Sequence, residues 1–312
     1  MNWAPIKLLP SRHAKPWGSK NLAPWFDSKG EQIGEYWFTA DANLTSTGQT
    51  LGELMEAHGQ ALTGTKVKLA EGIGSSGRFP ILVKFLFTTG DLSIQVHPDD
   101  VYGWAHENSP GKTEMWFVLN AEPGAKIALG FKEVTSVDRV RESVKSGEIV
   151  DLMEWVDATA GQAFFTPAGT VHAIGAGLAI CEIQQNSDIT YRFFDFNRKP
   201  LRELHVEKSL AVADLKPHPG ASVPVKTTEG ARLATCEYFE TELLQFTGSK
   251  QWTGDPERFH LLIFTRGSGS IAGQTFRLGD CWLIPAACTE YKVEAAEPVE
   301  MIRAFVPAST HS

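Results

Sequence analysis

Two side chains that metal ions accept as ligands stand at the end of one short apolar stretch. Gln95 and His97 lie two positions apart in "LSIQVHPDD" (92–100), and Pro98 follows directly. Side chains two apart on a strand point to the same face, so we expect Gln95 and His97 to reach one spot. Pro98 cannot donate a ladder hydrogen bond, which predicts that the strand ends there.

Two further ligand types open later strands. Glu114 begins "EMWFVL" 17 positions after His97, and His172 follows the turn "PAGT". A single histidine in a strand is usually an ordinary polar group, but here two imidazoles, a carboxylate and an amide all stand at strand ends. Together they predict a site for a divalent metal such as zinc.

Basic residues gather in the same segments. Lys84 lies in the strand before Gln95, Lys112 comes two positions before Glu114, and Arg192 stands inside the aromatic run "ITYRFFDF". Lysine and arginine are rarely buried without a partner. Arg192 is therefore the strongest candidate of the three for a functional role.

The overall charge limits the class of partner. The 312 residues carry a formal net charge of −8 and contain no apolar run of transmembrane length. We therefore expect neither nucleic acid nor a membrane as partner. A basic pocket on an acidic protein still permits an anionic small molecule. The four cysteines form no C-x-x-C pair and the N-terminus lacks a signal-peptide core, which predicts a cytoplasmic protein with reduced thiols.

The elements that must position these residues are mainly β-strands. Short β-branched and aromatic runs separated by turns dominate from Ile81 onward, which is typical of a sandwich or barrel. Helical spacing predicts a helix over 50–62 and another near "SVDRVRESVKSG" (136–147). The Pro- and Trp-rich segment 11–26 is predicted to be a loop packed on the body.

A repeated unit indicates two related barrels in tandem. "GQAFFTPAGTVH" (161–172) and "GDCWLIPAACTE" (279–290) share the spacing G-x5-P-A-x3 before a histidine or a glutamate. The repeat predicts a metal-binding jelly-roll domain over residues 1–214, with N-terminal and helical additions, and a second one over 215–312. Glu290 stands where His172 stands in the first copy, so the second domain is predicted to be metal-free.

Long stretches of the chain resemble a known enzyme family. "FPILVKFLFTTGDLSIQVHPDD", "GKTEMWFVL", "PAGTVHAIGAGLAICEIQQNSDITYRFFDFNR", "PWGS" and "IGEYW" resemble type I mannose-6-phosphate isomerases, above all their short bacterial form. The resemblance covers most of residues 1–200, whereas 215–312 match only as a second barrel. Larger members carry a helical domain between the positions of Glu114 and His172, for which the interval here is too short.

The resemblance implies a fold, an activity and a set of residues. That family has cupin-type jelly-rolls, binds one zinc ion per chain and interconverts mannose 6-phosphate and fructose 6-phosphate. Position by position, the likeness implies that four residues bind zinc, that one is catalytic and that four more surround the sugar phosphate. These are Gln95, His97, Glu114 and His172 for zinc, Arg192 for catalysis, and Lys112, Glu182, Lys84 and Ser93 around the substrate.

Isomerisation through an enediolate needs a group that moves a proton between two carbons, and Glu182 is our candidate. Two alternatives stay open from the residues alone. His97, Glu114 and His172 also match the two-histidine, one-carboxylate set of an iron-dependent cupin oxygenase. A non-catalytic module that binds sugar phosphates with a structural metal is the other alternative.

Overall fold

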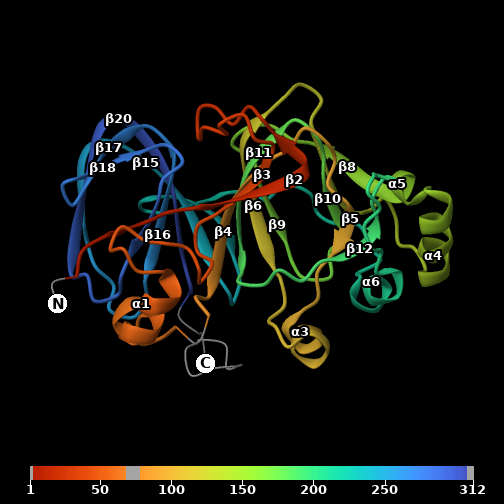
Figure 1. Ribbon diagram of the computed structural model, residues 1–312, viewed down its shortest axis with the longest axis horizontal. Helices are drawn as coiled ribbons and strands as arrows, with labels where there is room; N and C mark the ends of the chain where they lie inside the picture. Colours follow the sequence, from red (N-terminus) through yellow and green to blue (C-terminus); the bar gives the residue numbers. More distant parts are fainter. Residues whose placement is uncertain (1–2, 68–77, 308–312) are drawn as a thin grey trace.

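The computed structural model describes residues 3–67 and 78–307, and these form three antiparallel sheets (Figure 1). The six-stranded sheet has the order β2-β3-β4-β11-β6-β9. Its strands are β2 (Ser11–Ser19), β3 (Ile33–Trp37), β4 (Ile81–Phe87), β11 (Leu178–Gln185), β6 (Glu114–Ala121) and β9 (Ala163–Thr166). The mainly β class predicted from the sequence is confirmed.

A five-stranded sheet with the order β12-β5-β10-β7-β8 covers one face of the six-stranded sheet. Its strands are β12 (Tyr191–Phe194), β5 (Ile94–Val96), β10 (His172–Ile174), β7 (Lys126–Phe131) and β8 (Met153–Asp157). Leu86, Trp116 and Ile180 from the first sheet pack against Ile127 and Leu129 from the second. These apolar contacts hold the two sheets face to face.

The C-terminal part of the chain builds a nine-stranded sheet, which one N-terminal strand joins. Its strands are β1 (Ile6–Leu8), β19 (Cys281–Ile284), β16 (His260–Arg266), β20 (Glu290–Phe305), β15 (Glu240–Thr253), β14 (Gly230–Thr235), β13 (Val225–Lys226), β17 (Ser268–Ile271) and β18 (Gln274–Arg277). Because β1 pairs with β19, the N-terminus ties the two halves together. Both copies of the sequence repeat are strand–turn–strand units, β9 to β10 and β19 to β20.

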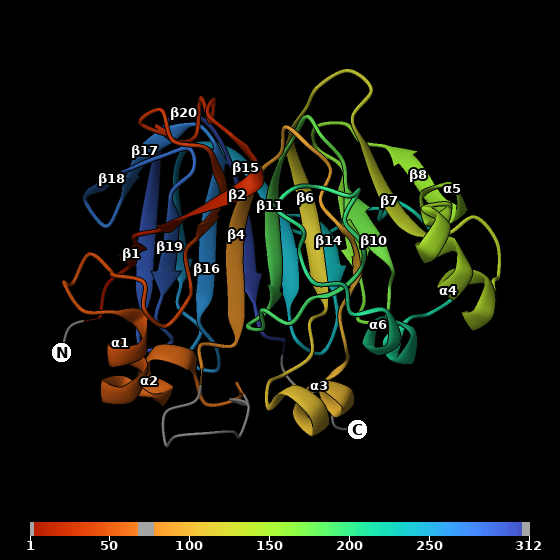
Figure 2. The same ribbon diagram turned by 45° about the vertical axis from the view of Figure 1, so that its right-hand side comes forward.

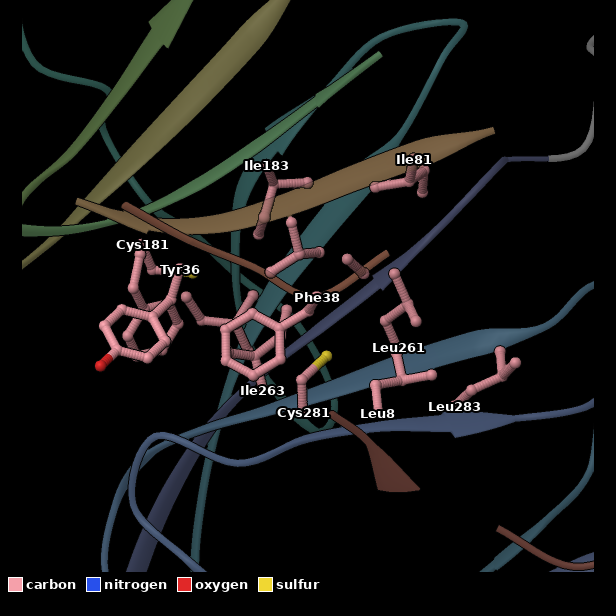
Figure 3. Packing of buried hydrophobic residues seen from close by; sticks show 14 of the residues in the cluster. Leu8, Tyr36, Phe38, Ile81, Cys181, Ile183, Leu261, Ile263, Cys281 and Leu283 are labelled. Atoms are coloured by element: carbon pink, nitrogen blue, oxygen red, sulfur yellow. The ribbon is translucent and has the colours of Figure 1, made fainter. Parts of the chain in front are cut away.

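The central strands β4 and β11 of the six-stranded sheet are buried on both faces. Every residue of β4 is buried because its second face packs on the nine-stranded sheet (Figure 2). In the close view, Ile81, Ile183 and Cys181 face Leu261 and Leu283 across this interface (Figure 3). The central strands that carry Lys84 and Glu182 therefore pack against another sheet on each face.

Short helices lie at the margins of the sheets in the described part of the chain. They are α1 (Leu51–His58), α2 (Gln60–Thr63), α3 (Asp100–Glu107), α4 (Val137–Ser146), α5 (Ile149–Leu152) and α6 (Val206–Val212). None of them has the length and apolar character needed to cross a membrane. The cysteines are all free thiols.

Two local predictions from the sequence are corrected. Segment 11–26 is not a loop throughout, because β2 pairs with β3 despite Pro16. Its register is irregular, with both Ala14 and Ser19 opposite Ile33, so the intervening residues bulge out. The helix expected over 50–62 starts at the capping box of Thr50 but divides in two at Gly59, which adopts a φ of 44°.

Candidate metal centre and adjoining pocket

A row of side chains crosses four adjacent strands of the six-stranded sheet. Trp37 on β3 stands opposite Lys84 on β4, Lys84 opposite Glu182 on β11, and Glu182 opposite Trp116 on β6. Residues opposite each other in neighbouring strands share a face. Strand register therefore brings Lys84 and Glu182, which are distant in sequence, into one polar row inside an apolar sandwich.

A second row faces it from the five-stranded sheet. Gln95 on β5 is paired with His172 on β10 and, on its other side, with Arg192 on β12. His97 follows β5 directly, and its imidazole centroid lies 4.9 Å from that of His172. The expectation that Gln95 and His97 share a face next to His172 agrees with these positions.

His97, Glu114 and His172 form a cluster whose potential ligand atoms all lie within 4.8 Å of one another. Glu114 Oε1 is 3.6 Å from His97 Nε2 and 3.3 Å from His172 Nε2. All three side chains are buried. Gln95 stands beside them, with its amide nitrogen 3.3 Å from His172 Nε2.

Backbone carbonyls fix the orientation of both imidazoles. His97 Nδ1 lies 2.6 Å from the carbonyl oxygen of Ile189, and His172 Nδ1 lies 2.9 Å from that of Thr170. Each Nδ1 must carry the proton to donate these hydrogen bonds, so each Nε2 presents a lone pair to Glu114. Such second contacts are what orient histidine ligands in metal sites.

The three ligand atoms of the cluster are all electron-pair donors, and the nearest hydrogen-bond donors, Lys112 and Gln95, lie to one side of each imidazole. Burial lowers the pKa of His172 to about 4, and burial together with Lys112 lowers the pKa of His97 well below its usual value, so both rings are neutral near pH 7. Glu114 Oε1 is buried and receives no hydrogen bond. Three electron-pair donors that converge in a buried space are satisfied by a cation, which is the physical case for a metal here.

The pKa of Glu114, in the cluster, and the pKa of Glu182, beside it, are shifted in opposite directions. Burial raises the pKa of Glu114 to about 8, although the neighbouring Lys112 opposes this change. Burial acts on Glu182 in the same direction, but Lys112, Lys84 and the indole of Trp116 outweigh it and hold the pKa of Glu182 below its usual value. Glu182 is therefore ionised at neutral pH, and Glu114 gains most from a cation beside it.

The two lysines predicted near the substrate are both almost fully buried, with 3% of Lys84 and 4% of Lys112 exposed. Lys112 Nζ lies 2.9 Å from Glu114 Oε2 and 3.1 Å from His97 Nε2. The carboxylates of Glu114 and Glu182 raise the pKa of Lys112 despite burial, so it stays charged. Lys84 Nζ lies 3.5 Å from Glu182 Oε2 and 4.3 Å from the ring centre of Trp37.

A cavity of about 120 Å³ adjoins the cluster and reaches the surface. Ser93, Gln95, Lys112, Glu182 and Arg192 are among the residues that line it. Ser93 Oγ donates to Gln95 Oε1 at 3.0 Å. Ligand sites typically measure about 300–1,000 Å³, so a larger ligand must extend through the mouth of this cavity into solvent. All nine predicted site residues line this cavity or belong to the cluster beside it.

A larger cavity, about 560 Å³, lies apart from this centre. It is lined by the β9–β10 turn and the segment 214–223, and it contains none of the four predicted metal ligands. His218 is half-buried there, with Nε2 2.9 Å from the carbonyl oxygen of Phe165. Size alone therefore does not identify the functional pocket.

Some residues of the pocket have no clear signal in the sequence. Arg202 lines the pocket only because of the path of its loop, and Trp37 contacts the pocket residue Lys84 only through strand register. His205 accepts a hydrogen bond from the backbone N–H of Arg192 at 3.2 Å. Aromatic neighbours draw attention to Arg192, but Arg202 lies in the polar, proline-containing segment "NRKPLRE", which resembles an ordinary surface loop.

Comparisons with known proteins point to one family. The sequence model of the type I phosphomannose isomerase catalytic domain matches residues 7–132. The mannose-6-phosphate isomerase ManA of Bacillus subtilis is 33% identical over 94% of this chain and 97% of its own length. The mannose-6-phosphate isomerase of Streptococcus mutans is 35% identical over 78% of this chain and 80% of its own.

A solved structure agrees in fold. The crystal structure of the mannose 6-phosphate isomerase from Bacillus subtilis superposes with a TM-score of 0.83 and 28% sequence identity. The match covers 96% of this chain and 99% of the other. Likeness therefore extends over both halves of the fold, including the C-terminal sheet, for which the sequence motifs are weakest.

Proposed function

The chain belongs to the mannose-6-phosphate isomerase family, and we propose that it interconverts mannose 6-phosphate and fructose 6-phosphate in the cavity beside His97, Glu114 and His172. The observation that carries the proposal is the buried cluster of three acceptors next to an ionised carboxylate, Glu182, in a cavity lined by cations. An aldose–ketose isomerase needs these groups together: a cation, a base and a partner for an anionic substrate.

We propose one zinc ion per chain at this cluster. His97 and His172 offer neutral Nε2 atoms, and Glu114 offers a carboxylate. Gln95 would offer its amide oxygen after a 180° rotation of the amide group, whose nitrogen now faces His172. Nitrogen and oxygen ligands in this number fit zinc. When bound, the ion would act as a Lewis acid that favours negative charge on the substrate oxygens near it.

Glu182 is the residue to which we assign proton transfer between C1 and C2. Its Oε1 accepts a hydrogen bond from Trp116 Nε1 at 3.0 Å, and its Oε2 faces Lys84. Because these contacts hold the carboxylate ionised and fixed in the cavity wall, it is ready to accept a proton. The proton returns to the neighbouring carbon to complete the isomerisation.

Three cations and a hydroxyl serve the substrate in this account. Lys112 is charged and close to Glu114, where it stabilises the negative charge that develops as the enediolate forms. Arg192 offers guanidinium donors opposite Gln95, suited to a sugar oxygen that becomes negative. Ser93 and Lys84 line the same cavity and contact the substrate in this proposal.

An iron-dependent oxygenase is the competing enzyme class, because His97, Glu114 and His172 also fit an iron(II) triad. The buried lysines argue for the isomerase. Lys84 and Lys112 surround Glu182 with positive charge, an arrangement that stabilises an anionic sugar intermediate.

A coupled assay that follows fructose 6-phosphate from mannose 6-phosphate tests the proposal. We expect turnover that a chelator removes and that added Zn²⁺ restores. Oxygen uptake without isomerisation would establish the oxygenase instead. Metal-dependent binding of mannose 6-phosphate without turnover would establish a binding module.

A further inference from the structure

The cations of the cavity differ in how fully their charge is already offset. Lys112 faces Glu114 at 2.9 Å and Lys84 faces Glu182 at 3.5 Å. Each ammonium is buried with a carboxylate of its own, so neither has an uncompensated charge to offer a doubly negative group. Lys15, also on the cavity wall, is paired with Glu35 at 3.1 Å.

The arginines near the cavity outnumber the carboxylates that pair with them, because Asp195 is the one acidic partner of Arg198 and Arg202 among the described residues. Arg202 donates from Nε to Asp195 Oδ2 at 2.7 Å, and its terminal nitrogen contacts Oδ1. The same carboxylate also receives Arg198 at 3.3 Å. Arg192 forms no ion pair within residues 3–67 and 78–307, and its buried Nε has no acceptor. Two guanidinium groups therefore share the carboxylate of Asp195, and the third, Arg192, has no ion-pair partner in these ranges.

The path of the chain places Arg192 and Arg202, and so this excess of positive charge, in the wall of the cavity. The loop that carries Arg202 leaves β12 and returns to it, because the His205 N–H donates to the Arg192 carbonyl at 2.8 Å and the Arg192 N–H donates to His205 Nδ1 at 3.2 Å. Arg192 and Arg202 both line the cavity. Burial is the largest cause of the lowered pKa of Arg192, and the positive charge of Arg202 is the second, because the two guanidinium groups lie close together.

We propose that Arg202 is the residue that anchors the phosphate group of the substrate, held in position by Asp195, while Arg192 acts on the sugar nearer to Gln95. The inference rests on the proposed function and adds a specificity-determining residue to it. Asp195 occupies the Nε–H and one terminal N–H of Arg202, and the remaining terminal N–H donors can match two oxygens of a phosphate monoester. Two guanidinium groups that repel each other gain when a dianion enters between them.

The competing explanation is that the Arg202–Asp195 pair only fastens the loop. Removal of Arg202 would then lower stability without a selective effect on phosphate-containing ligands. Arg202→Gln, Arg202→Lys and the matched control Lys199→Gln separate the two. Lys199 is exposed on the same loop and does not line the cavity, so its variant removes one positive charge nearby and leaves the mouth intact.

The measurements are steady-state kinetics with mannose 6-phosphate and with mannose, and calorimetric titration of each metal-loaded protein with inorganic phosphate. Arg202→Gln should raise the KM for mannose 6-phosphate and the Kd for phosphate about 10- to 100-fold, the loss that follows from one or two charge-assisted hydrogen bonds. Its kcat for mannose 6-phosphate and its kcat/KM for mannose should change little. Arg202→Lys should be intermediate, and Lys199→Gln should match the parent.

Unchanged KM and phosphate Kd in Arg202→Gln would overturn the proposal, as would an equal loss of kcat/KM for both sugars. If Arg202→Gln does not fold, Arg202→Lys keeps the charge and decides by the same two constants. A parent protein that binds phosphate through Arg202 but does not isomerise mannose 6-phosphate would support the anchor and refute the proposed function. The two claims therefore fail separately.

Discussion

Replacement of Glu182 by glutamine tests the assignment of proton transfer. Glutamine keeps the shape of the side chain and can still accept a hydrogen bond from Trp116, but it carries no charge and cannot act as a base. We expect kcat for mannose 6-phosphate to fall by about 10²- to 10⁴-fold, the usual contribution of a general base. The bound metal should remain, because Glu182 is not one of the proposed ligands.

The same replacement has a cost in stability that follows from the contacts of Lys84. With 3% of its surface exposed, Lys84 would lose its nearest carboxylate. Removal of one partner from a buried ion pair costs about 3–5 kcal/mol. Lys84 keeps the ring of Trp37 at 4.3 Å and Asp188 at 3.9 Å, so the lower end, about 3 kcal/mol, is expected.

A double variant separates the two effects. In Lys84→Met with Glu182→Gln the unpaired buried charge is gone, so the free energy of unfolding should recover most of the loss while kcat stays low. Urea unfolding, metal content and kcat are measured on one preparation of each variant. A Glu182→Gln protein with kcat near that of the parent, or a double variant in which kcat recovers together with stability, would refute the assignment.

Three further outcomes are expected. Arg192→Ala should lower kcat about 10²- to 10³-fold with the metal retained, in line with loss of one oxyanion-type donor; a destabilised, metal-loaded and fully active variant would mean that Arg192 is only structural. Anomalous scattering from crystals of the metal-loaded protein should place no transition metal near Glu290, and a peak there would contradict a metal-free second domain. Burial lowers the pKa of His260 to about 3, so the unfolded state binds the proton first as pH falls below about 6.5, and the free energy of unfolding should decline from there toward pH 3. His260→Gln should flatten that decline, and an unchanged slope in urea titrations at several pH values would show that other groups cause it.

The local chemistry of the metal centre could be predicted from the sequence because it depends on short patterns. Alternation along β5 predicts that Gln95 and His97 share a face, and Pro98 indicates where the strand ends. The capping box at Thr50 likewise indicates the start of α1. In each case the decisive residues lie within a few positions of one another.

The remainder depends on contacts between distant segments. Nothing near Trp37 in the chain indicates that it covers Lys84, because that contact follows from the register of β3 on β4. Arg202 belongs to a polar loop whose return to β12 is set by His205. Segment 11–26 has the composition of a loop, yet pairing with β3 makes part of it a strand, since tertiary contacts override weak local preference.

Reconstitution of the metal-free protein with zinc is the most direct test of whether His97, Glu114 and His172 hold a metal that isomerisation requires. We expect mannose 6-phosphate isomerase activity to rise linearly with added Zn²⁺ and to stop at one ion per chain, whereas His97→Ala should stay inactive and bind no ion at this site. Activity that is complete before any zinc is added, or a His97→Ala protein that binds one ion and isomerises mannose 6-phosphate like the parent, would contradict it.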